Sequence, residues 1–255
     1  MLRADRPERG RRTDRVGVVI PVYREGEALL WVLGRFAKGA VSTICLVVDA
    51  PEKEEMDRVR RAAEATGITV HIIKNRARRG VGHCLLQGLK YLRESGHTVA
   101  VVMAGNGKDD PREIERVTAP VLDGECEYVQ GSRYLEGGRW ERMPLTRQAF
   151  NRLSGPFWTI FTGRRCTDVT NGYRCYDLGI LDDRRIDLHQ DWLTGYSMEY
   201  YIHYKALVLG YRAKEVPVSK IYPFSNRGGY SKIQPLKDWW PIMSPPILLA
   251  LGVRE

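Results

Sequence analysis

Apolar residues along this chain gather in short runs that are rich in β-branched side chains. The runs at 16–20, 44–48, 68–73 and 99–103 have the length of strands. A run without polar alternation is typical of a strand that is buried on both faces, as in a parallel sheet covered by helices. The sequence therefore predicts four such strands in its first half.

Segments with helical spacing of apolar residues separate these strands. They lie at 28–36, at 52–66, where Gly67 ends a charged and exposed helix, and at 85–92. Strands that alternate with helices in this way indicate βαβ units and an α/β fold with a mostly parallel sheet. After residue 130 the rhythm loosens, and the elements expected there are helices at about 145–162 and 196–209 and a short strand near 213–218.

The run at 99–103 is the expected central strand, and a polar loop follows it directly. Gly105 and Gly107 permit tight turns and a close approach of a ligand to the backbone. Asp109 and Asp110 stand before Pro111, and a proline after an acidic cap is a helix-start signal. Ligands of open α/β sheets bind outside the carboxyl ends of the strands, so this loop is the first candidate site.

The domain organisation follows from these elements. Residues 1–14 are expected to form a disordered basic tail and 15–237 a single domain. Within it, about 15–130 is the predicted nucleotide-binding half and about 131–237 the acceptor-facing half. The segment 238–255 is apolar, aromatic and interrupted by prolines. It either packs on the domain or anchors the protein at a membrane interface, where aromatic side chains are favoured.

Charge changes the picture more than composition does. The chain has 255 residues with 43% hydrophobic and 28% charged residues, which is ordinary for a globular protein. Its formal net charge of +9 is less ordinary, and the first 14 residues carry only +2 of it. This balance favours an anionic partner such as a nucleotide, a phosphorylated lipid or a membrane surface, although a basic surface without a partner is also consistent with it. Signatures of nucleic-acid binding are missing, so no nucleic-acid partner is expected.

Cysteine and histidine spacing excludes other classes. The five cysteines contain no Cys-x-x-Cys pair, which favours a reduced, cytoplasmic setting over a disulfide framework. The histidines show no spacing of a structural zinc site. The charged N-terminus has no apolar stretch of a signal peptide, and no run of 18 apolar residues occurs, so the protein is not expected to span a membrane.

Several short motifs occur in an order and at a spacing that resemble one family. They lie at 19–25, 47–49, 80–83, 131–134, 168–174 and 215–218. Together they resemble the inverting nucleotide-sugar glycosyltransferases of the family that contains dolichyl-phosphate mannose synthase. The resemblance implies a GT-A fold with a Rossmann-like sheet, a UDP-sugar or GDP-sugar donor, and a polyprenyl phosphate or a small molecule as acceptor.

Candidate donor-binding residues come partly from chemistry and partly from this resemblance. Asp49, at the end of the second strand, can accept hydrogen bonds from a base or ribose, or it can simply form a turn. Gly80 and Gly82 at a helix N-terminus offer amides to an anion. Arg133 is a candidate for holding a phosphate or the developing charge of the leaving group, or a solvated surface arginine. The resemblance adds Pro21, Tyr23, Glu25, Asn106, Arg227 and Lys232, the last two in a loop at 226–232 that is expected to close over the diphosphate.

The chain departs from the family where a metal is normally held. The family reads Asp-x-Asp at this point and often has a glutamine two places on, whereas this sequence has Ala104, Asn106 and Lys108. Alanine cannot ligate a metal, and an ammonium repels a cation. Three readings remain, in this order: Lys108 supplies the positive charge, Asp109 and Asp110 hold Mg²⁺ or Mn²⁺, or the protein binds a nucleotide sugar without transferring it. A nucleotidyltransferase on a similar core is a further alternative.

The acceptor-facing half holds three candidate catalytic bases. Inversion with a hydroxyl acceptor needs a carboxylate base, and Asp168, Asp191 and Glu199 are available. The stretch 189–193 loosely resembles the segment that supplies this base in related enzymes. Each of these acids can equally be a helix cap or a surface charge. A phosphate acceptor is already ionised and needs no base.

Overall fold

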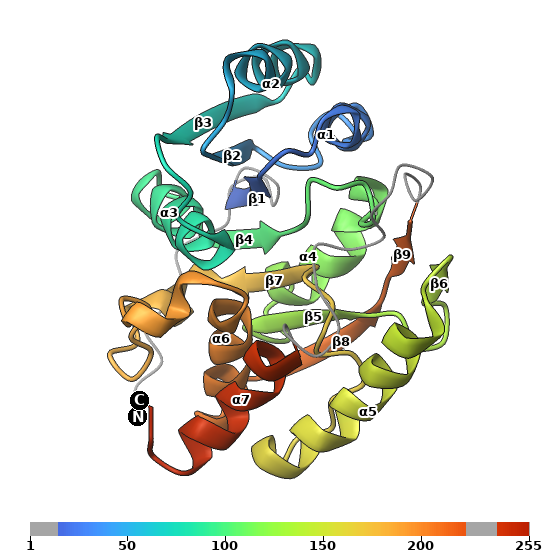
Figure 1. Cartoon of the computed structure of the whole chain (residues 1–255), viewed down its shortest axis with the longest axis vertical. Coiled ribbons are helices and arrows are strands. Elements are labelled where there is room, and N and C mark those ends of the chain that lie inside the picture. The colour runs from blue at the N-terminus through green and yellow to red at the C-terminus, as the bar shows by residue number, and fades with distance from the viewer. Residues whose placement is uncertain (1–14, 223–238, 255) are drawn as a thin grey trace.

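The fold is built on one mixed seven-stranded sheet. The computed structural model describes residues 15–222 and 239–254. The strands run in the order β3-β2-β1-β4-β7-β5-β8, and β7 is antiparallel to both of its neighbours (Figure 1). The predicted α/β fold with a mostly parallel sheet is thereby confirmed. The strands are β1 Val16–Val22, β2 Thr43–Asp49, β3 Thr69–Asn75, β4 Val99–Val102, β5 Tyr128–Ser132, β7 Arg174–Asp177 and β8 Ala213–Pro217.

Helices cover both faces of this sheet, which explains the unbroken apolar runs. Val18 and Ile20 of β1 point to a core shared with α1, α2 and α4, whereas Val19 between them points to a core shared with α3 and α6. All three side chains are 0% exposed, so both faces of the strand have to be apolar. The helices are α1 Glu27–Leu33, α2 Lys53–Ala65, α3 Val81–Glu94, α4 Ile114–Leu122, α5 Leu145–Thr162, α6 Ser197–Val208 and α7 Trp239–Ala250.

The second half adds a layer that lies beside the sheet. Helices α5, α6 and α7 share a third apolar cluster, with Trp158, Tyr204 and Ile242 among its members. A two-stranded ladder of β6 Arg139–Glu141 and β9 Ser219–Ile221 stands apart from the main sheet. Sequence reasoning missed β6, β7 and β9, because they are three or four residues long and carry charged side chains. The expected helix at about 145–162 matches α5.

The loop after β4 leads into a helix, as the acidic pair before the proline predicts. Pro111 opens a short 3₁₀ turn, η2 Pro111–Glu113, and α4 continues from it. The capping residue is Asp110, which accepts a hydrogen bond of 3.1 Å from the backbone N–H of Arg112. Among residues 15–222 and 239–254, no helix combines the length and the apolar character needed to cross a bilayer.

Candidate donor and acceptor site

The carboxyl ends of the parallel strands β1, β2 and β4 lie at one edge of the sheet. The neighbours of β1 are β2 on one side and β4 on the other, so the strand order changes direction at β1. Ligands of open α/β sheets bind at such a switch point. Two non-glycine residues have left-handed backbone here, Arg24 after β1 with φ 55° and Ala50 after β2 with φ 48°. Side chains other than glycine adopt this conformation at a cost, and such residues cluster at functional sites. The backbone itself therefore marks this edge.

Two of the residues that the resemblance implied, Tyr23 and Glu25, follow the end of β1 at this edge of the sheet. The ring of Tyr23 lies 4.7 Å from the guanidinium of Arg78, which comes from the loop before α3. The negative charge of Glu25 is close enough to Lys108 to influence its pKa. Pro21, by contrast, lies inside β1 opposite Val47 of β2, so its place is in the sheet.

Asp49 ends β2 as predicted, but its carboxylate is already engaged. The backbone N–H of Arg79 donates to it at 2.9 Å and 3.1 Å, and that of Gly80 donates at 3.0 Å. The side chain is buried. These bonds fix the turn that begins α3, which is the plainer of the two roles expected from the sequence. Contact of Asp49 with the nucleotide stays a prediction.

The glycines at the start of α3 serve a close contact between two backbones. A Cβ on Gly82 would lie 2.0 Å from the carbonyl oxygen of Leu193, and one on Gly80 would lie 2.5 Å from that of Thr194. Both carbonyls belong to the 3₁₀ turn η4 Asp191–Thr194. The N-terminus of α3 therefore packs against η4, and binding of an anion by its amides stays a prediction.

Lys108 lies in a cationic cluster at the end of β4. Its ammonium is 4.5 Å from the centre of the Tyr222 ring. Burial, followed by the charges of Lys220 and Arg147, lowers the pKa of Lys108 to about 7. Asn106 supports the same loop, because its Oδ1 accepts a hydrogen bond of 3.2 Å from the backbone N–H of Lys108. Three cations thus surround the place where the family holds a metal.

The two acidic residues of this loop do not fit a metal site. Asp109 is fully buried, accepts 2.5 Å and 3.0 Å hydrogen bonds from Lys220 Nζ and the backbone of Ala104, and thus neutralises Lys220. Asp110 binds Arg35 and Arg112, whose hydrogen bonds lower the pKa of Asp110 to about 2 against the opposing effect of burial. In the described part of the chain no three His, Cys, Asp or Glu residues are grouped as metal ligands. Both carboxylates are thus taken up by cationic side chains, and these residues do not fit a divalent cation.

Arg133 and Asp168 form a buried ion pair. Both side chains are at most 1% exposed, with 2.6 Å between Arg133 Nη2 and Asp168 Oδ1 and a second 2.6 Å bond from Nε to Oδ2. Against the opposing effect of burial, the carboxylate raises the pKa of Arg133. Asp168 is therefore committed to this pair and is unsuited to accept a proton from an acceptor.

The other two candidate bases differ in their surroundings. Asp191 is exposed at the start of η4. Glu199, on the first turn of α6, is nearly buried beside Arg174, and its Oε1 has no hydrogen-bond partner. Burial raises the pKa of Glu199, while Arg174 and Lys220 oppose the shift. Glu199 thus faces the cationic cluster, and its carboxyl is the better placed of the two to take a proton.

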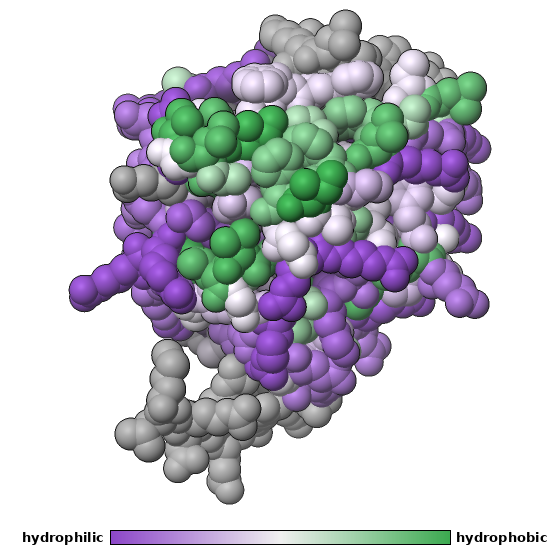
Figure 2. Space-filling model, turned by 90° about the horizontal axis from the view of Figure 1, so that it is seen from below, coloured by the Kyte–Doolittle hydropathy of each residue, from purple (hydrophilic) through white to green (hydrophobic). Residues whose placement is uncertain are grey.

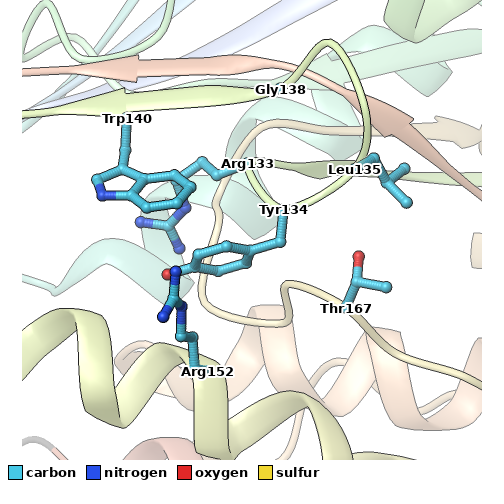
Figure 3. Close-up of a pocket in the computed structure, with 7 residues that line it drawn as sticks. All are labelled: Arg133, Tyr134, Leu135, Gly138, Trp140, Arg152 and Thr167. Atoms are coloured by element: carbon cyan, nitrogen blue, oxygen red, sulfur yellow. The ribbon is translucent and has the colours of Figure 1, made fainter.

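A cavity of about 380 Å³ opens beside Arg133. Figure 3 shows the ring of Tyr134 between Trp140 of β6 and Arg152 of α5. The ring centres of Tyr134 and Trp140 are 5.0 Å apart, and the guanidinium of Arg152 lies 5.6 Å from the Trp140 ring. Aromatic faces with exposed guanidinium groups suit a ligand that combines an anion with an apolar or sugar part. The lining residues are Arg133, Tyr134, Leu135, Gly138, Trp140, Arg152 and Thr167.

Sequence reasoning missed Lys220, Arg147 and Tyr222 in the cluster and Trp140 and Arg152 in the cavity. The first three come together through pairing of β9 with β6 and through the start of α5, and no local motif signals this. In the sequence, the positive charges of Lys220 and Arg147 contribute only to the net charge of +9. Arg227 and Lys232, with the loop expected to close over the diphosphate, lie outside the described residues.

Comparison with known proteins was made by sequence and by fold. The chain is 29% identical over 205 residues to undecaprenyl-phosphate mannosyltransferase of Micrococcus luteus, which covers 80% of this chain and 83% of that protein. It is 28% identical to polyprenol monophosphomannose synthase of Mycolicibacterium smegmatis, over 84% of this chain and 80% of that protein. No protein-family model matches the chain.

Among solved structures, glucosyl-3-phosphoglycerate synthase of Mycobacterium tuberculosis, bound to Mn²⁺, UDP and glucosyl-3-phosphoglycerate, has the same fold. It aligns with a TM-score of 0.63 at 14% identity, over 95% of this chain and 81% of that one. The sheet order and this structural likeness thus define a glycosyltransferase fold of the GT-A type. The names of its sequence relatives agree with the resemblance to the dolichyl-phosphate mannose synthase-like family, and the chain is a glycosyltransferase.

Proposed function

We propose that this enzyme transfers a sugar from a nucleoside diphosphate sugar to a polyprenyl phosphate, with inversion, and without a divalent cation at the donor diphosphate. The observation that carries the proposal is the cluster of Lys108, Lys220 and Arg147 at the end of β4. It stands where the family holds a metal between two carboxylates. The names of the sequence relatives, which include polyprenyl phosphate mannosyltransferases, support the acceptor.

The cluster suits a diphosphate for electrostatic reasons. Lys220 is paired with Asp109, and Lys108 and Arg147 add positive charge at the same place. An ammonium about 4 Å from a phosphate oxygen contributes roughly 4 kcal/mol of attraction at an effective dielectric constant near 20. A bound diphosphate in turn favours the protonated form of Lys108 and holds it charged. This is the charge that a metal supplies in the family.

The reaction we propose is a single displacement. A phosphate oxygen of the acceptor attacks the anomeric carbon of the sugar as the bond from that carbon to the diphosphate oxygen breaks. The electron pair of that bond moves onto the diphosphate, where Lys108 and Arg147 stabilise the added negative charge. The acceptor phosphate is already ionised, so no side chain has to remove a proton.

The cavity between β6 and α5 is the place we assign to the acceptor. Arg133 lines this cavity, and Tyr222 is close enough to contribute to the raised pKa of Arg133. The ring of Tyr222 in turn lies against Lys108. The cavity and the cationic cluster therefore share this wall. Arg152 is an exposed lining residue of the cavity. Unlike Arg133, it is not held by an ion pair with Asp168, so we assign the acceptor phosphate to Arg152.

A second candidate is transfer to a hydroxyl group of a small acceptor. The observation that favours it is Glu199, whose unpartnered Oε1 and raised pKa suit a general base near the cluster. In that case Glu199→Gln lowers turnover by roughly 100-fold while donor affinity stays unchanged. With a phosphate acceptor, the same variant retains turnover.

The test begins with titration of UDP-sugars and GDP-sugars by calorimetry, with chelator and with added Mn²⁺ or Mg²⁺. We expect unchanged affinity in chelator and a loss of about 100-fold in Lys108→Ala, in line with the attraction estimated above. Lys90→Ala, on the exposed side of α3, is the control and should bind as the wild type. Loss of binding in chelator with recovery on either ion would overturn the metal-free site.

Turnover of the bound donor with a short polyprenyl phosphate then tests the acceptor. Product with this acceptor and none with hydroxyl compounds supports the proposal. Binding without turnover on any acceptor would favour a nucleotide-sugar-binding protein, and preference for nucleoside triphosphates would favour a nucleotidyltransferase.

We also propose a cytoplasmic location, because all five cysteines are free and buried.

A further inference from the structure

One outer face of the molecule is apolar where most of the surface is polar. On α5, the exposed residues Leu145, Ala149, Leu153, Pro156 and Ile160 follow each other at spacings of three and four. Leu145, Leu153 and Ile160 are 71–80% exposed. Residues at these spacings share one side of a helix, and such a stripe normally faces a core. Here it faces outward, while the opposite side of α5 contributes Ser154, Trp158 and Thr162 to the interior.

The end of the chain extends this face. Phe150 of α5 stacks on Trp239 of α7 at a ring distance of 4.4 Å, which joins the two helices. Trp240, Leu251 and Val253 follow with 62–71% of their surface exposed. Figure 2 views the molecule from the end at which α5 and α7 lie in Figure 1, and apolar surface crosses it with hydrophilic side chains along its border. We call these exposed residues of α5 and of 240–253 the apolar face.

The two segments that carry the apolar face hold charges of a single sign. The segments 142–165 and 239–254 contain no aspartate or glutamate. They contain the five exposed arginines Arg142, Arg152, Arg164, Arg165 and Arg254, besides Arg147 of the cationic cluster. The surface of α2, at the other end of the molecule in Figure 1, mixes Glu54 and Glu64 with Arg58 and Arg61. An ordinary solvated helix therefore looks different from α5.

We propose that the apolar face docks this protein on a lipid bilayer that carries anionic headgroups. Aliphatic side chains and Trp240 enter the boundary between headgroups and acyl chains, and the arginines meet the lipid phosphates. A second copy of the chain fits less well, because a two-fold interface would set the arginines of one face against those of the other. Arg152 adjoins Leu153 and also lines the cavity, so the cavity opens beside the docked surface.

This inference deepens the proposed function, because a polyprenyl phosphate is itself held in a bilayer. Its test uses neither donor nor acceptor, so the two can fail separately. The full chain is sedimented with vesicles of phosphatidylcholine alone or of phosphatidylcholine with phosphatidylglycerol. We expect at least about tenfold stronger partitioning onto the anionic vesicles, weakened by added salt. Equal or absent binding to the two kinds of vesicle would overturn the proposal.

Two double variants and one control locate the surface. Leu153→Glu with Ile160→Glu should lower partitioning by at least about tenfold, and Leu153→Ser with Ile160→Ser should do so by about half as much on a logarithmic scale. Arg61→Glu on α2 removes the same two units of charge at the far end and should stay within about twofold, because charges beyond the Debye length are screened. An unchanged circular-dichroism spectrum and melting temperature show that each variant is folded.

The outcomes are decisive in both directions. Loss in the two double variants with retention in Arg61→Glu places the bilayer on the apolar face. Equal partitioning of all variants would mean that the vesicles bind elsewhere and would overturn it. Sedimentation velocity without vesicles is the last check, since self-association that Leu153→Glu with Ile160→Glu abolishes would assign the face to a second copy instead.

Discussion

The two halves of the sheet are stabilised by different contacts. Around β1, β2 and β4 the interior is apolar, and the buried carboxylates Asp49 and Asp109 sit at the carboxyl edge. Around β5 and β7 the interior contains charged and polar side chains at most 2% exposed, among them Arg133, Asp168, Arg174, Asn171, Gln130 and His203. The first half is therefore specified by burial and the second by pairing, and a mutation has a different consequence in each.

The largest effect is expected from breaking the buried pair of the second half. Asp168→Ala leaves the guanidinium of Arg133 buried without its partner and should lower the free energy of unfolding by about 3–5 kcal/mol. Urea titration measures it. Asp182→Ala removes an exposed partner of Arg93 and should cost less than about 1 kcal/mol. Equal losses in the two variants would show that pairing does not specify the second half.

The contact between the halves should come next. Gly82→Ala places a methyl group against the carbonyls of η4, and since backbone cannot move aside, we expect a loss of about 1–3 kcal/mol in unfolding free energy. Gly195→Ala has open space around its Cβ and is the matched control, with a change below about 1 kcal/mol. A wild-type melting curve for Gly82→Ala would show that α3 and η4 separate freely.

The charge of the first half predicts a pH dependence. The pKa of Lys108 is lowered to about 7, and a diphosphate favours the protonated form. Donor affinity should therefore be constant below pH 7 and fall by up to about tenfold per pH unit above it, until the pKa of the complex is reached. Calorimetry between pH 6 and about pH 9 measures this. Lys108→Arg stays ionised and should show a flat profile, whereas a sloping profile in that variant would assign the titration to another group.

The smallest effect is expected at Asp191. With a phosphate acceptor no base is needed, and Asp191→Asn at an exposed site should leave turnover within about twofold of the wild type. Steady-state rates with saturating donor measure it. A fall of roughly 100-fold would restore Asp191 as the base and argue for a hydroxyl acceptor.

What the sequence predicted follows the same division. Unbroken apolar runs and helical spacing are local signals, so β1, β2, β4 and the extent of α5 could be read from them. The strand β7 begins with the buried Arg174. The charge of this guanidinium is offset by the carbonyls of Val169 and Asn171 and by Glu199. No residue pattern near Arg174 in the sequence predicts these partners. An arginine in a short apolar segment is instead typical of an exposed position, so the sequence argues against a buried strand here.

The candidate site shows the same limit. Its position at the carboxyl ends of the strands followed from the order of strands and helices, and Lys108 was identified from the departure in one motif. The partner of Asp109 is Lys220, 111 positions further along the chain, and the partner of Arg133 is Asp168, 35 positions further. Pairs at such separations depend on the tertiary fold. Sequence reasoning therefore named Asp109, Arg133 and Asp168 but assigned them to a metal, a phosphate and an acceptor proton, and it missed Lys220 altogether.

The close approach of Gly82 to Leu193 also limits how the enzyme can move. Where two backbones touch without a side chain between them, neither can rotate about the contact without a collision. The main sheet also runs without a break from β1 through β4 and β7 to β5. Among the described residues, this contact and the shared sheet join the two halves along this edge, so we expect no large rotation of one half against the other. The donor then meets a site that is already assembled, and little binding energy is diverted into reshaping the protein.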